Sequence, residues 1–336
     1  MRGTKARRTA GFSFGAARCV AGFFFLGALL LGGCAGFSPQ TDALDTQRPA
    51  GLPPRAEIRD VPYFPQDEYH CGPAALAMAL NASGVKVTGD ALVEQVYLPG
   101  RKGSLQVEML AAARRNGRVA YLLAPELTAL LREVAAGTPV IVLENFGAPF
   151  YPLWHYSVVI GYDLERSEII RHSGKHERTP GALRLFEFFW QKENRWAMVA
   201  VPPERVPVTA TEPRYAGAVV ALEKAGQPRA ARSAYESMLK RWPASLAALM
   251  GAGNTAYVLG DLASAETRFR EATAAHPASV PALNNLAQTL LDRGKIDEAR
   301  VMAERAVALG GPLLARTRAT LETIQTRQRA NDARQK

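Results

Sequence analysis

Several features that identify common classes of protein are missing from this sequence of 336 residues. It has no glycine-rich loop to cradle phosphate and no series of apolar spans, so the parts of an ATPase or a transporter are absent. The formal net charge is +10, but no basic cluster lies beside aromatic residues, which disfavours nucleic-acid binding. Glu108 and Glu144 are isolated acids, so no glycosidase carboxylate pair is indicated.

Metal-binding patterns are also scarce. His172 and His176 have the spacing that brings two imidazoles together on a helix, but Gly174 between them points to a strand and a turn. We therefore expect no metal site and no cofactor.

The N-terminal segment, residues 1–34, has the features of a secretory signal: a basic start, an apolar core near 20–31 and the sequence Leu-Gly-Gly-Cys ending at Cys34. The apolar run is short for a spanning helix. The segment resembles a bacterial lipoprotein signal, which implies that Cys34 is lipidated and becomes the mature N-terminus. Ala35 after the cysteine resembles an outer-membrane address, which implies the periplasmic face of the outer membrane of a Gram-negative bacterium. A plain cleaved signal or a short anchor is the alternative.

Cysteine is rare, with only three in the chain. Cys19 would leave with the signal and Cys34 would carry lipid, so Cys71 would be the one remaining thiol and could form no intramolecular disulfide. Such a thiol is either a small buried hydrophobe or a reactive group.

Cys71 opens an apolar helical stretch. Gly72 permits a tight approach, Pro73 suits a first helical turn, and residues 74–80 are good helix formers. A thiol at a helix N-terminus feels the positive end of the dipole, which favours the thiolate. The side-chain amide of Gln66 lies upstream, and His155 begins an apolar strand, so an oxyanion donor and a general base are available.

The segments that follow the signal differ in composition. Residues 35–55 are rich in proline and polar residues and are predicted to be a tether. Residues 56–203 predict an α+β domain, in which helices near 73–83, 89–97 and 105–116 precede an antiparallel sheet. Further elements are predicted at the following ranges: strands at 119–123, 140–143, 155–162, 168–171 and 196–201, and helices at 125–136 and 186–191.

Residues 212–313 show a period of 34, because Trp242-Pro-Ala-Ser recurs as His276-Pro-Ala-Ser. Glycines 226, 260 and 294 align on the same register. This pattern resembles three tetratricopeptide repeats, near 212–245, 246–279 and 280–313, which implies an all-α solenoid with a groove for a protein partner. An irregular helical bundle is the alternative, and 314–336 are expected to form a polar capping helix with a frayed tail.

The first domain resembles the bacteriocin-processing cysteine peptidases, which cleave double-glycine leaders. The resemblance spans roughly 58–202 and rests on Gln66, on the stretch that starts at Cys71 and on the strand that starts at His155. It implies a papain-like fold and thiol proteolysis of an extended peptide. Gln66, Cys71 and His155 would then serve as oxyanion donor, nucleophile and base.

The third catalytic position departs from that family, in which an acid follows the histidine strand and orients the imidazole. Ser173 stands at the corresponding place, with Gly174 after it. Asp163 is one alternative to the acid, although a turn-starting aspartate is the simpler interpretation, and Asn145, whose amide oxygen could orient the ring, is another.

These observations predict a lipid-anchored thiol peptidase of the cell envelope with a helical-repeat arm. A non-catalytic peptide-binding scaffold is one alternative, favoured by the missing acid. The other is a papain-like enzyme that transfers an acyl group to an amine.

Overall fold

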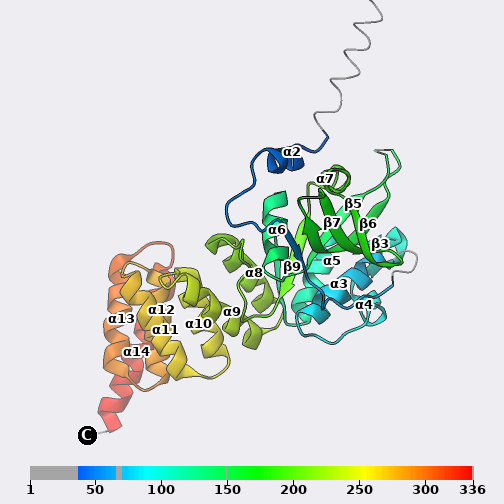
Figure 1. Ribbon diagram of the computed structural model, residues 1–336. Coiled ribbons are helices and arrows are strands. Elements are labelled where there is room, and N and C mark those ends of the chain that lie inside the picture. The colour runs from blue at the N-terminus through cyan, green and yellow to red at the C-terminus, as the bar shows by residue number, and fades with distance from the viewer. Residues whose placement is uncertain (1–36, 66–69, 149, 335–336) are drawn as a thin grey trace, which may run out of the picture.

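The computed structural model describes residues 37–65, 70–148 and 150–334. A sheet-containing α+β domain is followed by a run of paired helices, which confirms the predicted fold class (Figure 1). Cys34 and Gln66 lie outside the described residues.

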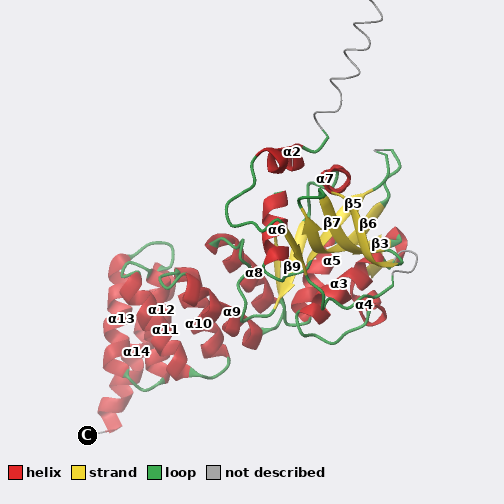
Figure 2. Cartoon of the chain, viewed as in Figure 1, coloured by secondary structure: helices red, strands yellow, loops and turns green. Residues whose placement is uncertain are grey.

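The domain is built on a seven-stranded antiparallel sheet (Figure 2). Its strands are β1 (Arg55–Glu57), β4 (Val119–Leu122), β5 (Val140–Asn145), β6 (Trp154–Asp163), β7 (Glu168–Ser173), β8 (His176–Ala182) and β9 (Ala197–Val201). They are ordered β4-β9-β5-β6-β7-β8, and β1 pairs with the far end of β6, beyond the part that pairs with β5. The strand β6 is therefore central, and its first residues lie where β5 ends.

Helices cover both faces of the sheet because its strands are apolar on both sides. One face carries α3 (Cys71–Ala82), α4 (Gly89–Val96) and α5 (Gln106–Arg115), whose buried side chains pack on Ile141, Tyr156 and Val158. The other face carries α6 (Leu127–Ala135) and α7 (Leu183–Gln191), packed on Val142 and Val159. A short hairpin of β2 (Tyr97–Leu98) and β3 (Gly103–Ser104), joined by η2 (Pro99–Arg101), lies between α4 and α5.

The segment predicted as a free tether is instead packed on the domain. Residues Pro39–Thr46 form the helix α2, and the buried carboxylate of Glu187 accepts hydrogen bonds from the backbone N–H groups of Gln40 and Thr41 and from the Thr41 hydroxyl. Leu44 is buried, and β1 joins the sheet. The polar, proline-rich composition predicted a free segment, but a few buried groups are enough to hold such a segment against the domain.

The repeats form three helix pairs and a final helix. These are α8 (Glu212–Lys224) with α9 (Pro228–Arg241), α10 (Leu246–Val258) with α11 (Leu262–Ala275), α12 (Val280–Asp292) with α13 (Ile296–Leu309), and α14 (Leu314–Arg334). The aligned glycines have positive φ at each inter-helix turn, as a C-terminal cap requires. A Cβ on Gly251 would lie 2.3 Å from the Tyr235 ring, so small residues make room for the repeat aromatics.

One hydrophobic cluster continues from the sheet domain into the first repeat. The ring centroids of Tyr121 on β4 and Tyr215 on α8 are 6.2 Å apart, and both side chains are buried in the cluster that underlies α6 and α7. Arg214 also donates to the backbone oxygens of Leu122 and Leu123. The first repeat is therefore fixed to the sheet rather than linked flexibly. In the described part of the chain, no helix has both the length and the apolar character needed to cross a membrane.

Candidate active site

Cys71 is the first residue of α3, two residues before the predicted start. The residue is partly exposed and its sulfur is a free thiol. Gly72 lets the helix start approach the β2–β3 hairpin, because a Cβ there would lie 2.3 Å from Ser104 Oγ. The predicted role of this glycine in a close approach is confirmed.

Three backbone amides interact with the sulfur. The N–H groups of Tyr156, Gly72 and Cys71 itself face it and favour the thiolate, but burial has the larger effect and raises the pKa of the Cys71 thiol. The N–H groups at the helix start thus favour the thiolate, but desolvation has the larger effect on the Cys71 pKa. The contact with Tyr156 places the sulfur beside the start of β6, where His155 is the preceding residue.

His155 is the second residue of β6, and its ring is held by two neighbours. The Nε2 atom lies 3.0 Å from Ser173 Oγ at the end of β7, and the ring centroid is 5.7 Å from that of Phe146. Burial, and then the positive charge of Arg171, lowers the pKa of His155 to about 4. At neutral pH the imidazole is uncharged and can accept a proton.

The positive charge belongs to Arg171, which is part of a buried ion pair that the sequence alone does not predict. Arg171 on β7 pairs with Glu144 on β5, and the Ser157 hydroxyl donates to the same carboxylate at 2.6 Å. Burial raises the pKa of Glu144. Glu144 is isolated from other acids in the sequence, yet it lies directly across from His155 in the β5–β6 pairing. The register of a predicted hairpin between these strands would have revealed the relation.

Of the three residues considered for orienting the imidazole, the structure brings only Ser173 to it. The Asp163 carboxylate accepts the backbone N–H groups of Glu165 and Arg166 in the turn at the opposite end of β6, so the turn interpretation holds. Asn145 Oδ1 accepts the N–H groups of Gly147 and Leu153 and thereby fixes the β5–β6 loop.

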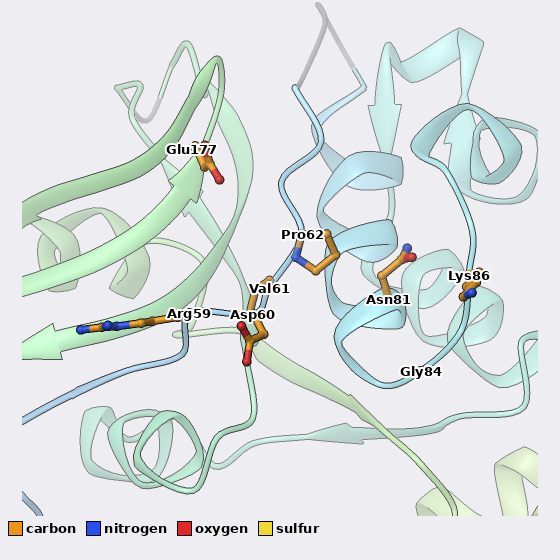
Figure 3. Close-up of a pocket in the computed structure, with 8 residues that line it drawn as sticks. All are labelled: Arg59, Asp60, Val61, Pro62, Asn81, Gly84, Lys86 and Glu177. Carbon is orange, nitrogen blue, oxygen red and sulfur yellow. The ribbon is translucent and has the colours of Figure 1, made fainter.

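Other candidates do not join this site. His172 is buried and its Nε2 donates to the carbonyl oxygen of Val61 at 3.1 Å. No group of residues in the described ranges has the composition of a metal site. A shallow pocket of about 480 Å³ lies at the C-terminal end of α3, lined among others by Arg59, Lys86 and Glu177, so it is a full helix length from Cys71 (Figure 3).

The fold and this site define a protein with a cysteine-peptidase-like α+β domain and a helical-repeat arm. Residues 58–198 match the model of the Peptidase_C39 like family, and residues 217–280 and 251–313 match that of the tetratricopeptide repeat. The chain thus carries a Peptidase_C39-like domain followed by tetratricopeptide repeats, as the sequence resemblance implied.

Three solved structures illustrate the similarities that were found. The first repeat domain of Spaghetti (RPAP3) bound to an HSP90 peptide is 18% identical, with a TM-score of 0.33, over 35% of this chain and 92% of that one. The chaperone SycD of Yersinia enterocolitica with a YopD peptide is 16% identical, with a TM-score of 0.33, over 34% and 93%. The Sgt2 domain from Aspergillus fumigatus is 17% identical, with a TM-score of 0.34, over 36% and 82%. Among curated proteins, none matches the chain.

Proposed function

We propose that the protein is a thiol peptidase that cleaves an extended peptide or protein in the cell envelope. The observation that carries the proposal is that His155 lies within hydrogen-bonding distance of Ser173. In addition, the backbone contact with Tyr156 puts the Cys71 sulfur beside β6, the strand that carries His155. The family match supports a peptidase-like fold.

Before substrate reacts, the Cys71 thiol and the His155 imidazole are both neutral, so the reaction begins with proton transfer between them. With Nε2–H donating to Ser173, the other ring nitrogen takes the thiol proton as sulfur attacks the carbonyl carbon. The oxyanion that forms is stabilised by the backbone N–H of Cys71 and, in this proposal, by the amide of Gln66. The C–N bond then breaks, the imidazolium gives its proton to the leaving amine, and water hydrolyses the thioester to free the acid and the thiol.

One observation favours the non-catalytic scaffold as a second candidate. The thiol and the imidazole have pKa values shifted away from each other, and a serine replaces the acid that would stabilise the imidazolium. A domain with such a pair would bind a peptide without cutting it. Acyl transfer to an amine would use the same thiol and differs only in what attacks the thioester.

Labelling with a thiol-reactive peptide electrophile separates these functions. We expect rapid labelling of the native chain, none for Cys71→Ala, and labelling at least about 100-fold slower for His155→Ala, because the base is lost. A labelling rate unchanged in His155→Ala would contradict the peptidase and support the scaffold. With a labelled peptide substrate, an added amine that appears in the product would indicate transfer rather than hydrolysis.

The second part of the proposal is anchoring by lipid on Cys34 at the periplasmic face of the outer membrane, with the repeats recruiting a protein partner. The signal-like segment supports the anchor, and the repeat match supports the partner site. Metabolic labelling with palmitate should mark the native chain and not Cys34→Ser. Equal incorporation by both would disprove lipidation at this residue.

A further inference from the structure

A row of aromatic side chains runs over the surface of the catalytic domain from the first described residue to the active site. Ring centroids are 5.6 Å apart for Phe37 and Phe188, 5.3 Å for Phe188 and Phe189, and 4.9 Å for Phe189 and Phe146. Phe146 in turn contacts His155. Phe37 lies just before α2, and Phe188 and Phe189 lie on α7. These two helices lie together at one end of the domain (Figure 1).

Much of this apolar surface is open to solvent. Phe37 is 55% exposed and Leu185 on α7 is 54% exposed, and both line one shallow hollow with Phe188. We call five residues the aromatic face: Phe37, Phe146, Leu185, Phe188 and Phe189. Contiguous exposed apolar surface of this kind marks an interaction site.

The charges around the face suit a lipid surface better than an acidic or basic protein. Lys192 lies 4.5 Å over the ring of Phe188 and donates to the Gly147 carbonyl, so a cation borders the rings. Asp42 and Asp45 at the other edge are paired with Arg184. Aromatic and aliphatic side chains beside an exposed lysine are typical of elements that insert into the headgroup region of a bilayer.

The position of Cys34 decides which partner covers the face. Three peptide units separate Cys34 from Phe37, so their Cα atoms are at most about 11 Å apart. Phe37 itself is fixed to α7, because its carbonyl accepts from Gln191 Nε2 at 2.7 Å and Ser38 Oγ donates to the Arg184 carbonyl. A lipid on Cys34 would therefore hold this face, and not the repeats, against the membrane.

We propose that the aromatic face docks on the lipid bilayer, so that the active site opens at the membrane surface and acts on peptides that emerge from it. The inference rests on the proposed lipidation of Cys34.

Tryptophan quenching tests the docking with a matched pair of reporters. Trp154 is the most exposed native tryptophan, so it is first replaced by phenylalanine; the reporters are then Leu185→Trp on the face and Val258→Trp on α10, which is 70% exposed on the repeats. The full lipidated chain is placed in phosphatidylethanolamine vesicles with or without brominated acyl chains. We expect roughly twofold quenching of the Leu185→Trp fluorescence by brominated lipid and little change for Val258→Trp.

The outcomes separate anchoring from docking. A chain that fails to float with the vesicles overturns the anchor and, with it, the docking. A chain that floats but shows equal quenching at both reporters overturns the docking alone. In detergent, a dimer that Leu185→Glu dissociates would assign the face to a second copy of the chain and overturn the bilayer as its partner.

Discussion

The Nε2 atom of His155 lies 3.0 Å from the hydroxyl oxygen of Ser173, at the place where the bacteriocin-processing peptidases carry an acid. A hydroxyl can fix the orientation of the ring, but it adds no negative charge to stabilise an imidazolium. With Arg171 on the same strand, the site keeps its base neutral. The proposed peptidase would thus work from a neutral thiol and a neutral imidazole.

Substitution of Ser173 tests the orienting bond. We expect Ser173→Ala to lower kcat/KM about tenfold, which corresponds to the loss of one hydrogen bond, and Ser173→Thr to retain activity because it keeps the hydroxyl. Ser173→Asp should raise the pKa of His155 through its negative charge. Peptide hydrolysis at several pH values checks all three, and native kinetics in Ser173→Ala would remove the serine from the mechanism.

The pH dependence of activity follows from the lowered pKa of His155. Because the imidazole stays uncharged until the pH falls to about 4, kcat/KM should hold through the range near 6.5 where an ordinary histidine gains its proton, and decline only near 4. In Ser173→Asp the acid limb should move to higher pH. An acid limb near 6.5 in the native chain would show that the base is not desolvated as the structure describes.

Gly72 offers a test of the helix start. A methyl group there would lie 2.3 Å from Ser104 Oγ and 2.6 Å from its Cβ, so Gly72→Ala should lower the stability of the chain and displace Cys71. We expect a loss of about 1–3 kcal/mol in the free energy of unfolding, typical of overpacking, together with reduced activity. Adding Ser104→Gly removes both clashing atoms and should restore stability.

Gly100→Ala is the matched control for that experiment. Nothing lies within 4 Å of a Cβ at Gly100, and its φ is not positive, so this change should leave the thermal midpoint and the activity unaltered. Equal effects of the two substitutions would mean that the contact with Ser104 is not the cause.

The shared core predicts that the peptidase-like domain and the first repeat unfold together. Tyr215 is fully buried against Tyr121, so Tyr215→Ala should cost about 3–5 kcal/mol, and the native chain should show one thermal transition for the sheet domain and the first repeat. Val258→Ala, at an exposed position on α10, should change stability by less than about 0.5 kcal/mol. Calorimetry that resolves an independent transition for the sheet domain, unaffected by Tyr215→Ala, would contradict the shared core.

The elements that the sequence missed share a physical cause. The strand β8 has an exposed, polar pattern and contains Pro180, which an edge strand tolerates because one side of it needs no hydrogen bonds. The helix α2 and the strand β1 are short and polar, and they are held by distant groups such as Glu187. Neither an exposed edge strand nor a short polar element produces a periodic pattern of apolar residues in the sequence.

The sequence by itself determined what depends on neighbours along the chain: the helix that begins near Cys71, the apolar strand after His155 and the 34-residue repeat. Only the tertiary structure decided that Ser173 meets the imidazole while Asp163 stays in its turn, because strand register brings together residues that are distant in sequence. It also decided that the thiol and the imidazole are both neutral, since desolvation depends on the layers packed over them. For the same reason it turned the predicted tether into part of the domain and joined the repeats to the sheet through a common core.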